Sequence, residues 1–283
     1  MHLYRAPPAR LRPFVSVVWA TDGASRARRL GARERALPTG AMHLAMRLSE
    51  HPVRVFDGPA AREARVVAHA VVAGARTAPY VRDIPGPVRS VGAQLRPGAC
   101  ELLFGVPAGE LAERHTALED LWGAAAVALR DRLHESGTLD QQLALFESAF
   151  AARLPRVRGL HPAVAQALDW FNRRSDIAEV VRQTGYSHRY FIALFRDAVG
   201  LTPKRYCGIR RFRRALARLV ANPSVALSAA AVDEGYSDQA HFTREFRRFA
   251  GMPPGAYRRA VADTASADRW RRAHHLPIPG GER

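Results

Sequence analysis

The sequence predicts an α+β protein of two domains, with a β-rich N-terminal domain and an all-α C-terminal domain that contains two helix-turn-helix units. Three observations lead to this fold class. Apolar residues alternate with a period of two in the first part of the chain, helical spacing replaces this period after Leu118, and one string of residues near the C-terminus occurs twice. We expect a β-rich domain at residues 1–115, a helical linker at 116–158, the helix-turn-helix domain at 159–262 and a flexible tail at 263–283.

Short segments of the N-terminal domain have the pattern of strands with one buried face. Met42 to Leu48 alternates apolar and polar residues and follows the turn-forming Pro38-Thr39-Gly40. Further strands are expected at residues 53–55, 65–73 and 88–95. Several short strands with turn-rich joints are typical of a small barrel or sandwich, which we therefore expect here.

Two apolar stripes at helical spacing follow the strands. The first runs from Leu118 to Leu133 and the second from Leu139 to Leu154, so two helices are expected in the linker. Such stripes usually pack on their own domain, and we favour that arrangement. The alternative is a subunit interface, which would make the protein a homodimer.

A string that begins with Gly-Tyr-Ser occurs at residues 185–187 and again at 235–237, which indicates one supersecondary unit used twice. In each copy the triplet is followed by the same residue types in the same order. The matching residues are Phe191, Phe195, Arg196, Gly200, Pro203 and Tyr206 in the first copy, and Phe242, Phe246, Arg247, Gly251, Pro254 and Tyr257 in the second. The unit has the form of a helix-turn-helix, whose second helix can enter a DNA major groove.

Local signals place the ends of these helices, and the two helix-turn-helix motifs are expected at residues 177–199 and 227–250. Asp176 with Glu179 matches a capping box before the first helix, and Ser187 is suited to cap the second. A long helix that starts at Pro203 should join the two units. At about 1.5 Å per residue it spans roughly 25 Å and holds the two units apart. Two recognition helices separated by one DNA turn, about 34 Å, can enter successive major grooves on one face.

The outward side of each second helix carries side chains that suit the reading of base edges. Arg can pair with guanine and Gln with adenine through two hydrogen bonds, while Ala and Thr methyl groups can contact the thymine methyl. The predicted DNA-binding residues are Arg189, Ile192, Ala193 and Arg196 in the first unit, and Gln239, Ala240, Thr243, Arg244 and Arg247 in the second.

Composition agrees with a nucleic-acid partner and excludes several classes of protein. The formal net charge is +17, which favours a polyanionic partner. No apolar run is long enough to cross a membrane and the N-terminus lacks the pattern of a secretion signal, so we expect a cytoplasmic protein without membrane contact. Cys100 and Cys207 fall in different predicted domains, which excludes a disulfide framework or a thiolate zinc site. We expect no metal and no cofactor.

The N-terminal domain shows no catalytic pattern, so we expect no enzymatic activity. His43, His69, His115, Glu101 and Asp83 are too scattered to have metal-ligand spacing, and no phosphate-binding loop is present. Two alternatives stay open: a fused N-terminal enzymatic domain, and an architectural DNA binder that needs no ligand.

Four side chains of the first domain are of types that line pockets. They are Trp19, His43, Arg47 and Tyr80. Because such residues more often lie at the surface or in the core, the sequence assigns no ligand-binding residue.

The segment from His161 to Arg259 resembles the DNA-binding domain of the AraC/XylS family of bacterial transcription regulators. The string from Gly235 to Arg248, then Gly251-Met252-Pro253-Pro254 and Tyr257-Arg258, is close to the family signature. The resemblance implies seven helices in two helix-turn-helix units. It also implies a transcription regulator that binds double-stranded DNA, acts with RNA polymerase, and is modulated through its first domain by a small-molecule effector or a partner.

The resemblance also bears on individual residues and on the N-terminal domain. It implies base contacts from Arg189, Ile192 and Ala193, and from Gln239, Ala240, Thr243 and Arg244. Ile192 and Ala193 stand where the family often has polar residues, so we expect the second unit to carry more of the hydrogen-bonded specificity. Residues 37–40, 95–98 and 104–108 look like those of sensor-type domains attached to this family and imply a cupin-like β-domain, without a ligand.

Overall fold

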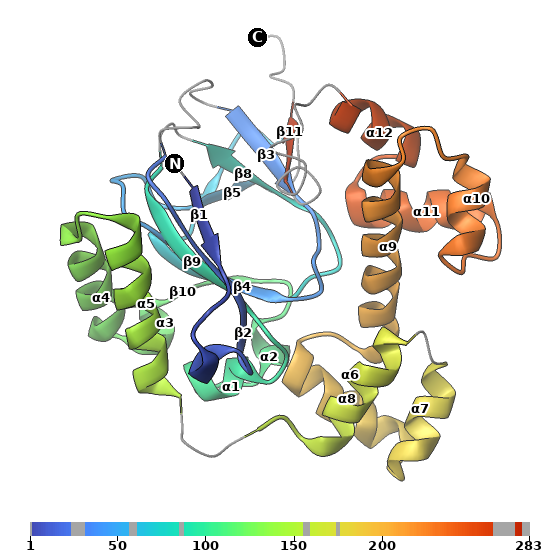
Figure 1. Cartoon of the computed structure of the whole chain (residues 1–283), viewed down its shortest axis with the longest axis horizontal. Helices are drawn as coiled ribbons and strands as arrows, with labels where there is room; N and C mark the ends of the chain where they lie inside the picture. Colours follow the sequence, from blue (N-terminus) through green and yellow to red (C-terminus); the bar gives the residue numbers. More distant parts are fainter. Residues whose placement is uncertain are drawn as a thin grey trace.

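A computed structural model describes residues 2–23, 32–56, 61–84, 88–154, 159–173, 176–262 and 275–278. A β-rich N-terminal region is followed by a helical C-terminal region, the order that the sequence predicts (Figure 1). The expected domain boundary at residues 155–158 and most of the expected tail lie outside the described residues.

The strands of the N-terminal region form two antiparallel sheets. In the first, the strand order is β1-β2-β9-β4-β7-β10, and in the second it is β11-β3-β8-β5-β6. The first sheet contains β1 (His2–Arg5), β2 (Val15–Thr21), β4 (Met42–Arg47), β7 (Ala70–Ala73), β9 (Ser90–Leu95) and β10 (His115–Ala117). The second contains β3 (Ala32–Ala36), β5 (Arg54–Phe56), β6 (Arg65–Val66), β8 (Tyr80–Ile84) and β11 (His275–Ile278). Among the described strands the ladders do not close into a barrel.

Two segments differ from the strands expected from the sequence. The single strand expected at residues 65–73 is two strands, β6 and β7, which belong to different sheets. Residues 275–278, expected within a flexible tail, form β11 and pair antiparallel with β3. An unpaired edge strand offers backbone donors and acceptors to any segment that reaches it. Which segment pairs with the edge therefore depends on the tertiary structure and is not visible in the local sequence.

The helices of the linker cover one face of the first sheet. They are α3 (Glu119–Trp122), α4 (Ala124–Glu135) and α5 (Leu139–Arg153), and α5 begins with a complete capping box between Thr138 and Gln141. Leu129, Phe146 and Phe150 are buried in the main core. These three side chains are therefore buried within the chain and do not offer a surface to a second copy.

Seven helices form the described part of the C-terminal region, the number that the resemblance implies. They are α6 (Pro162–Asn172), α7 (Ile177–Thr184), α8 (His188–Val199), α9 (Pro203–Ala221), α10 (Leu227–Asp233), α11 (Gln239–Ala250) and α12 (Pro254–Ala262). Figure 1 shows α9 running between one group of helices, α6 to α8, and a second group, α10 to α12. No helix of the described residues is both long and apolar enough to cross a lipid bilayer.

Candidate nucleic-acid interface

The first helix-turn-helix unit is built from local caps and a glycine turn. Asp176 accepts hydrogen bonds from the backbone N–H groups of Ala178 and Glu179, and Ser187 accepts one from Tyr190. Gly185 between the helices has a φ of 73°, which glycine adopts without strain. The expected capping box is only half formed, because the Glu179 carboxylate binds Arg182 and Gln183 instead.

The second unit differs from the first at the turn. Asp238 caps α11 by accepting a hydrogen bond from His241 N at 2.7 Å, whereas Ser237 donates to Asp238. Tyr236 is buried at 4% exposure, while its counterpart Tyr186 is 40% exposed. The second copy has one more residue between its Gly-Tyr-Ser triplet and its first Phe than the first copy has. The cap lies one position later in the second unit, and the two turns are not equivalent.

Aromatic side chains fix the rotation of both second helices. Phe191 and Phe195 of α8 and Phe242 and Phe246 of α11 are fully buried. Phe195 contacts Tyr206 of α9, with ring centroids 5.6 Å apart, and on the same helix Phe212 lies 5.2 Å from Phe246. Because α9 contributes to both aromatic clusters, it holds the two units in one arrangement.

The residues predicted to bind DNA lie on the opposite, outward side. In α8, Arg189, Ala193 and Arg196 are exposed and Ile192 is half-buried. In α11, Gln239, Ala240, Arg244 and Arg247 are exposed and Thr243 is half-buried. The four arginines of this set make no ion pair within the described part of the chain, so each guanidinium is available to a partner.

Three arginines of α9 have a different role. Arg211 binds Glu245 of α11 at 2.8 Å, Arg214 binds Glu234 at 2.9 Å, and Arg218 binds Asp233. These ion pairs attach α10 and α11 to α9. The positive charge of Arg211, Arg214 and Arg218 is therefore largely neutralised within the domain, unlike that of the outward arginines.

The C-terminal end of α8 contacts the N-terminal domain at α1 (Ala99–Phe104) and α2 (Ala108–Leu111). Gly98 N donates to Ala198 O at 2.8 Å, and a Cβ on Gly200 would lie 3.1 Å from Ala108 O. The Arg196 Cγ atom lies 3.4 Å from the place where a Cβ on Gly109 would stand. Arg196 therefore belongs partly to this domain contact, whereas Arg189, Ile192 and Ala193 lie nearer the other end of α8.

The sequence reasoning missed an exposed aromatic pair beside α8. Tyr190 is 52% exposed, and its ring centroid lies 4.9 Å from that of Tyr186. The signal that could have identified Tyr190 is its place next to Phe191, which is buried, so that Tyr190 falls outside the apolar stripe. Tyrosine hydroxyl groups are common donors to DNA phosphates.

Comparison with known proteins agrees with this geometry. Residues 180–260 match a family model described as a helix-turn-helix domain. The chain is similar to the probable transcriptional regulator LumQ of Photobacterium leiognathi, with 35% identity over 86 residues, 30% of this chain and 34% of LumQ. The C-terminal region is an AraC-type helix-turn-helix domain.

Outside the AraC-type domain, residues 4–117 match a domain of unknown function, DUF6597. The uncharacterised regulator YbfP of Bacillus subtilis is 29% identical over 100 residues, 34% of each chain. This chain thus spans about a third of the length of the curated relatives that it matches. Among solved structures, ToxT of Vibrio cholerae with a bound unsaturated fatty acid aligns over 84% of this chain and 94% of its own, at 9% identity and a TM-score of 0.44.

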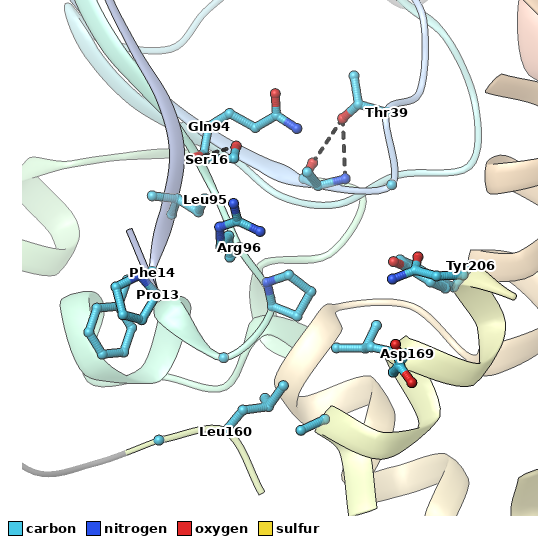
Figure 2. Close-up of a pocket in the computed structure, with 18 of the residues that line it drawn as sticks. Pro13, Phe14, Ser16, Thr39, Gln94, Leu95, Arg96, Leu160, Asp169 and Tyr206 are labelled. Atoms are coloured by element: carbon cyan, nitrogen blue, oxygen red, sulfur yellow. Dashed lines mark hydrogen bonds between the residues drawn. The ribbon is translucent and has the colours of Figure 1, made fainter. Parts of the chain in front are cut away.

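A cleft lies where the AraC-type domain meets the N-terminal domain. Its volume is about 980 Å³. Figure 2 shows Thr39 and Gln94 on the β-rich side of this cleft and Asp169 and Tyr206 on the helical side. Thr39 holds its turn together through hydrogen bonds to the backbone of Ala41 at 3.2 and 3.3 Å.

A second, smaller cavity lies inside the N-terminal domain, next to the AraC-type domain, and its volume is about 170 Å³. Trp19, His43, Arg47 and Tyr80, the four side chains of pocket-lining types in the sequence, all line it. They come from strands of both sheets, with β4 contributing His43 and Arg47 from the face opposite its buried Met42 and Leu44. Among the described residues no three His, Cys, Asp or Glu side chains are grouped as metal ligands.

Two imidazoles that line this cavity, those of His43 and His115, are held in the neutral form. Burial, with smaller effects from Arg82 and Arg213, lowers the pKa of His43 to about 4. Burial, Arg76, Arg65 and Arg82 lower the pKa of His115 to about 3. Neutral imidazoles can each donate one hydrogen bond without adding charge.

These shifts predict a loss of stability in mild acid. The unfolded chain protonates these imidazoles near pH 6.5, whereas the folded chain resists protonation until pH about 4 or lower, so acid favours unfolding. We expect the free energy of unfolding to fall by on the order of 1–2 kcal/mol per imidazole between pH 7 and 5. Urea denaturation at the two pH values measures this. The His43→Gln, His115→Gln double variant should lose most of this pH dependence of stability. The His51→Gln variant, at an exposed position, should keep it. Equal stability of the unmodified protein at both pH values would contradict the lowered pKa values of His43 and His115.

Proposed function

We propose that the protein is a sequence-specific transcription regulator in which α8 and α11 enter successive major grooves on one face of double-stranded DNA. The observation that carries this proposal is the pair of second helices held on α9, each with a buried aromatic face and an exposed polar face. The 19 residues of α9 span about 28 Å, close to the length of one DNA turn.

Charge supports the same assignment. Arg189, Arg196, Arg244 and Arg247 form no ion pair within the described part of the chain, while Arg211, Arg214 and Arg218 of α9 are paired. Unneutralised arginines on the second helices favour phosphates and guanine edges. Tyr186 and Tyr190 add hydroxyl groups at the start of α8, where phosphate contacts orient a recognition helix.

The proposal assigns DNA binding to residues 159–262 and sensing to residues 1–115 together with the helices of 116–158. The two sheets of the sensing part would act as a cupin-like ligand domain, and the regulator would work in the cytoplasm together with RNA polymerase. One chain presents both second helices, so this geometry binds a pair of half-sites without needing a second copy.

Selection of bound sites from random duplexes, with the full-length protein, tests the proposal. We expect enrichment of two short motifs about ten base pairs apart, since successive grooves on one face repeat at that distance. Affinity for the selected site should fall steeply with salt, because several phosphates are neutralised by arginine. Enrichment of a single motif would mean that only one of the two helices, α8 or α11, reads bases. Binding without enrichment of any motif would favour an architectural DNA binder.

A further inference from the structure

The walls of the cavity between the two sheets are aromatic on opposite sides. Trp19 of β2 lies across Gly92 of the neighbouring β9, where a Cβ would come within 2.3 Å of the indole. The missing side chain at Gly92 is what allows the indole to lie against the sheet. Tyr80 of β8 faces the cavity from the other sheet. A volume of about 170 Å³ is comparable to that of an apolar cavity that admits benzene.

Two polar atoms at one end of the cavity are unsatisfied. The Nε atom of Arg76 and the Nε2 atom of His115 are buried without a hydrogen-bond partner among the described residues. Both side chains pack on Tyr80, with the Arg76 Cζ atom 4.5 Å from the ring centroid and the His115 ring at the same centroid distance in an edge contact. Buried polar atoms are usually hydrogen-bonded in proteins, and here two unsatisfied nitrogens lie together beside a cavity that has room for an acceptor.

The ionic charges of the cavity wall do not balance. Arg47 is paired with Asp83, and Arg82 with Glu34. Arg76 forms no ion pair in the described structure, and the nearby Glu113 accepts its hydrogen bonds from Thr77. Arg76 is thus a guanidinium of the wall without an ion pair in the described structure, on which the Glu113 carboxylate acts only at longer range, and its Nε is one of the two unsatisfied nitrogens.

We propose that this cavity binds a small organic carboxylate with a flat apolar body, whose carboxylate accepts hydrogen bonds from Arg76 and His115. The flat body lies between Trp19 and Tyr80. An Arg–carboxylate contact is charge-assisted and compensates the buried guanidinium, while the neutral His115 donates a second hydrogen bond. This inference deepens the proposed function and rests on it for one point, that the ligand is the effector of the regulator.

The cavity is connected to α9 through the turn at residues 38–41. Thr39 and Ala41 line both the cavity and the larger cleft beside the helical domain. On the far side of the same turn, a Cβ on Gly40 would lie 3.4 Å from Ile209 Cγ2 and 3.9 Å from the Tyr206 ring. A ligand that moves this turn must therefore also move the helix that sets the distance between α8 and α11.

Benzoate and its neutral counterpart benzamide, added to the full-length protein, test the site by titration calorimetry and thermal unfolding. Benzoate should bind with a Kd of about 1 mM or tighter, as its nine non-hydrogen atoms allow, and benzamide at least about tenfold more weakly. Arg76→Gln should weaken benzoate binding by about tenfold or more. Arg114→Gln, an exposed arginine close to His115 in the chain, is the matched control and should leave it unchanged.

Four outcomes would overturn the site. They are no benzoate binding to the unmodified protein, equal binding of benzamide, undiminished binding to Arg76→Gln, and equal binding of inorganic phosphate, which has no flat body. If Arg76→Gln fails to fold, His115→Phe keeps the ring contact with Tyr80 and removes the donor, and undiminished binding to it would also contradict the proposal.

The link to DNA is measured separately, as operator affinity with and without benzoate. We expect a change of at least about threefold, within the usual range of allosteric coupling. Benzoate binding without a change in operator affinity would overturn the link through the turn while leaving the ligand site. Absence of operator binding in both conditions would overturn the proposed function, and calorimetry would still decide the ligand site.

Discussion

Replacing Arg244 with Ala is expected to weaken operator binding by about 1–3 kcal/mol, a factor of roughly 5 to 150, and to relax the preference at one base pair. Arg244 is exposed on α11 and makes no ion pair within the described part of the chain, so its guanidinium is available to a base edge. Fluorescence anisotropy with the selected site and with single-base variants of that site measures both effects.

A charge-matched control separates base reading from general attraction to DNA. Arg132→Ala removes the same charge from α4 of the N-terminal domain, where the side chain is exposed, and should change operator affinity little. Arg244→Ala should also bind random DNA nearly as well as the unmodified protein. An equal loss on random and selected DNA would show that Arg244 contacts phosphate and does not read a base.

Gly74→Ala is expected to have the largest effect on stability, a loss of about 3 kcal/mol or more in the free energy of unfolding. Gly74 follows β7, and its N–H donates to Arg114 O at 2.9 Å. A Cβ at this position would lie 1.7 Å from Leu111 O, a backbone atom that cannot move aside like a flexible side chain. Substitution must therefore separate two segments of the main chain.

Urea denaturation at neutral pH measures this loss. Gly159→Ala is the control, because no atom lies within 4 Å of the Cβ that it would add. The control should unfold at nearly the same urea concentration as the unmodified protein. Equal stability of the Gly74→Ala variant would mean that the backbones at residues 74 and 111 do not approach as closely as the structure has them.

Much of the C-terminal region could be predicted because its signals are local. The helices α7, α8 and α9 begin where Asp176, Ser187 and Pro203 place them, and Gly185 closes the turn between the first two. Caps, turns and apolar spacing depend on residues three or four positions apart, so they can be recognised in the sequence. At α11 the cap is Asp238, although Ser237 holds the place in its triplet that Ser187 holds in the first, because adjacent residues of similar chemistry compete for the same donors.

The N-terminal region was less predictable because its strands pair over long distances. The alternation at Met42 to Leu48 correctly located β4, but nothing local showed that residues 65–73 leave one sheet and enter the other. The same is true of the candidate sites. The outward position of the DNA-binding candidates followed from helical periodicity, whereas the contact of Arg196 with the N-terminal domain did not.

By itself, the sequence determined that the chain carries twin helix-turn-helix units with arginine-bearing outer faces, because repeats, caps and periodicity are properties of neighbouring residues. Only the tertiary structure decided that Trp19, Arg76, Tyr80 and His115 share one cavity and that this cavity adjoins the turn against α9. These side chains come from separate segments of two sheets. Their proximity is set by strand order and by the packing of one domain on the other, which no short-range pattern encodes.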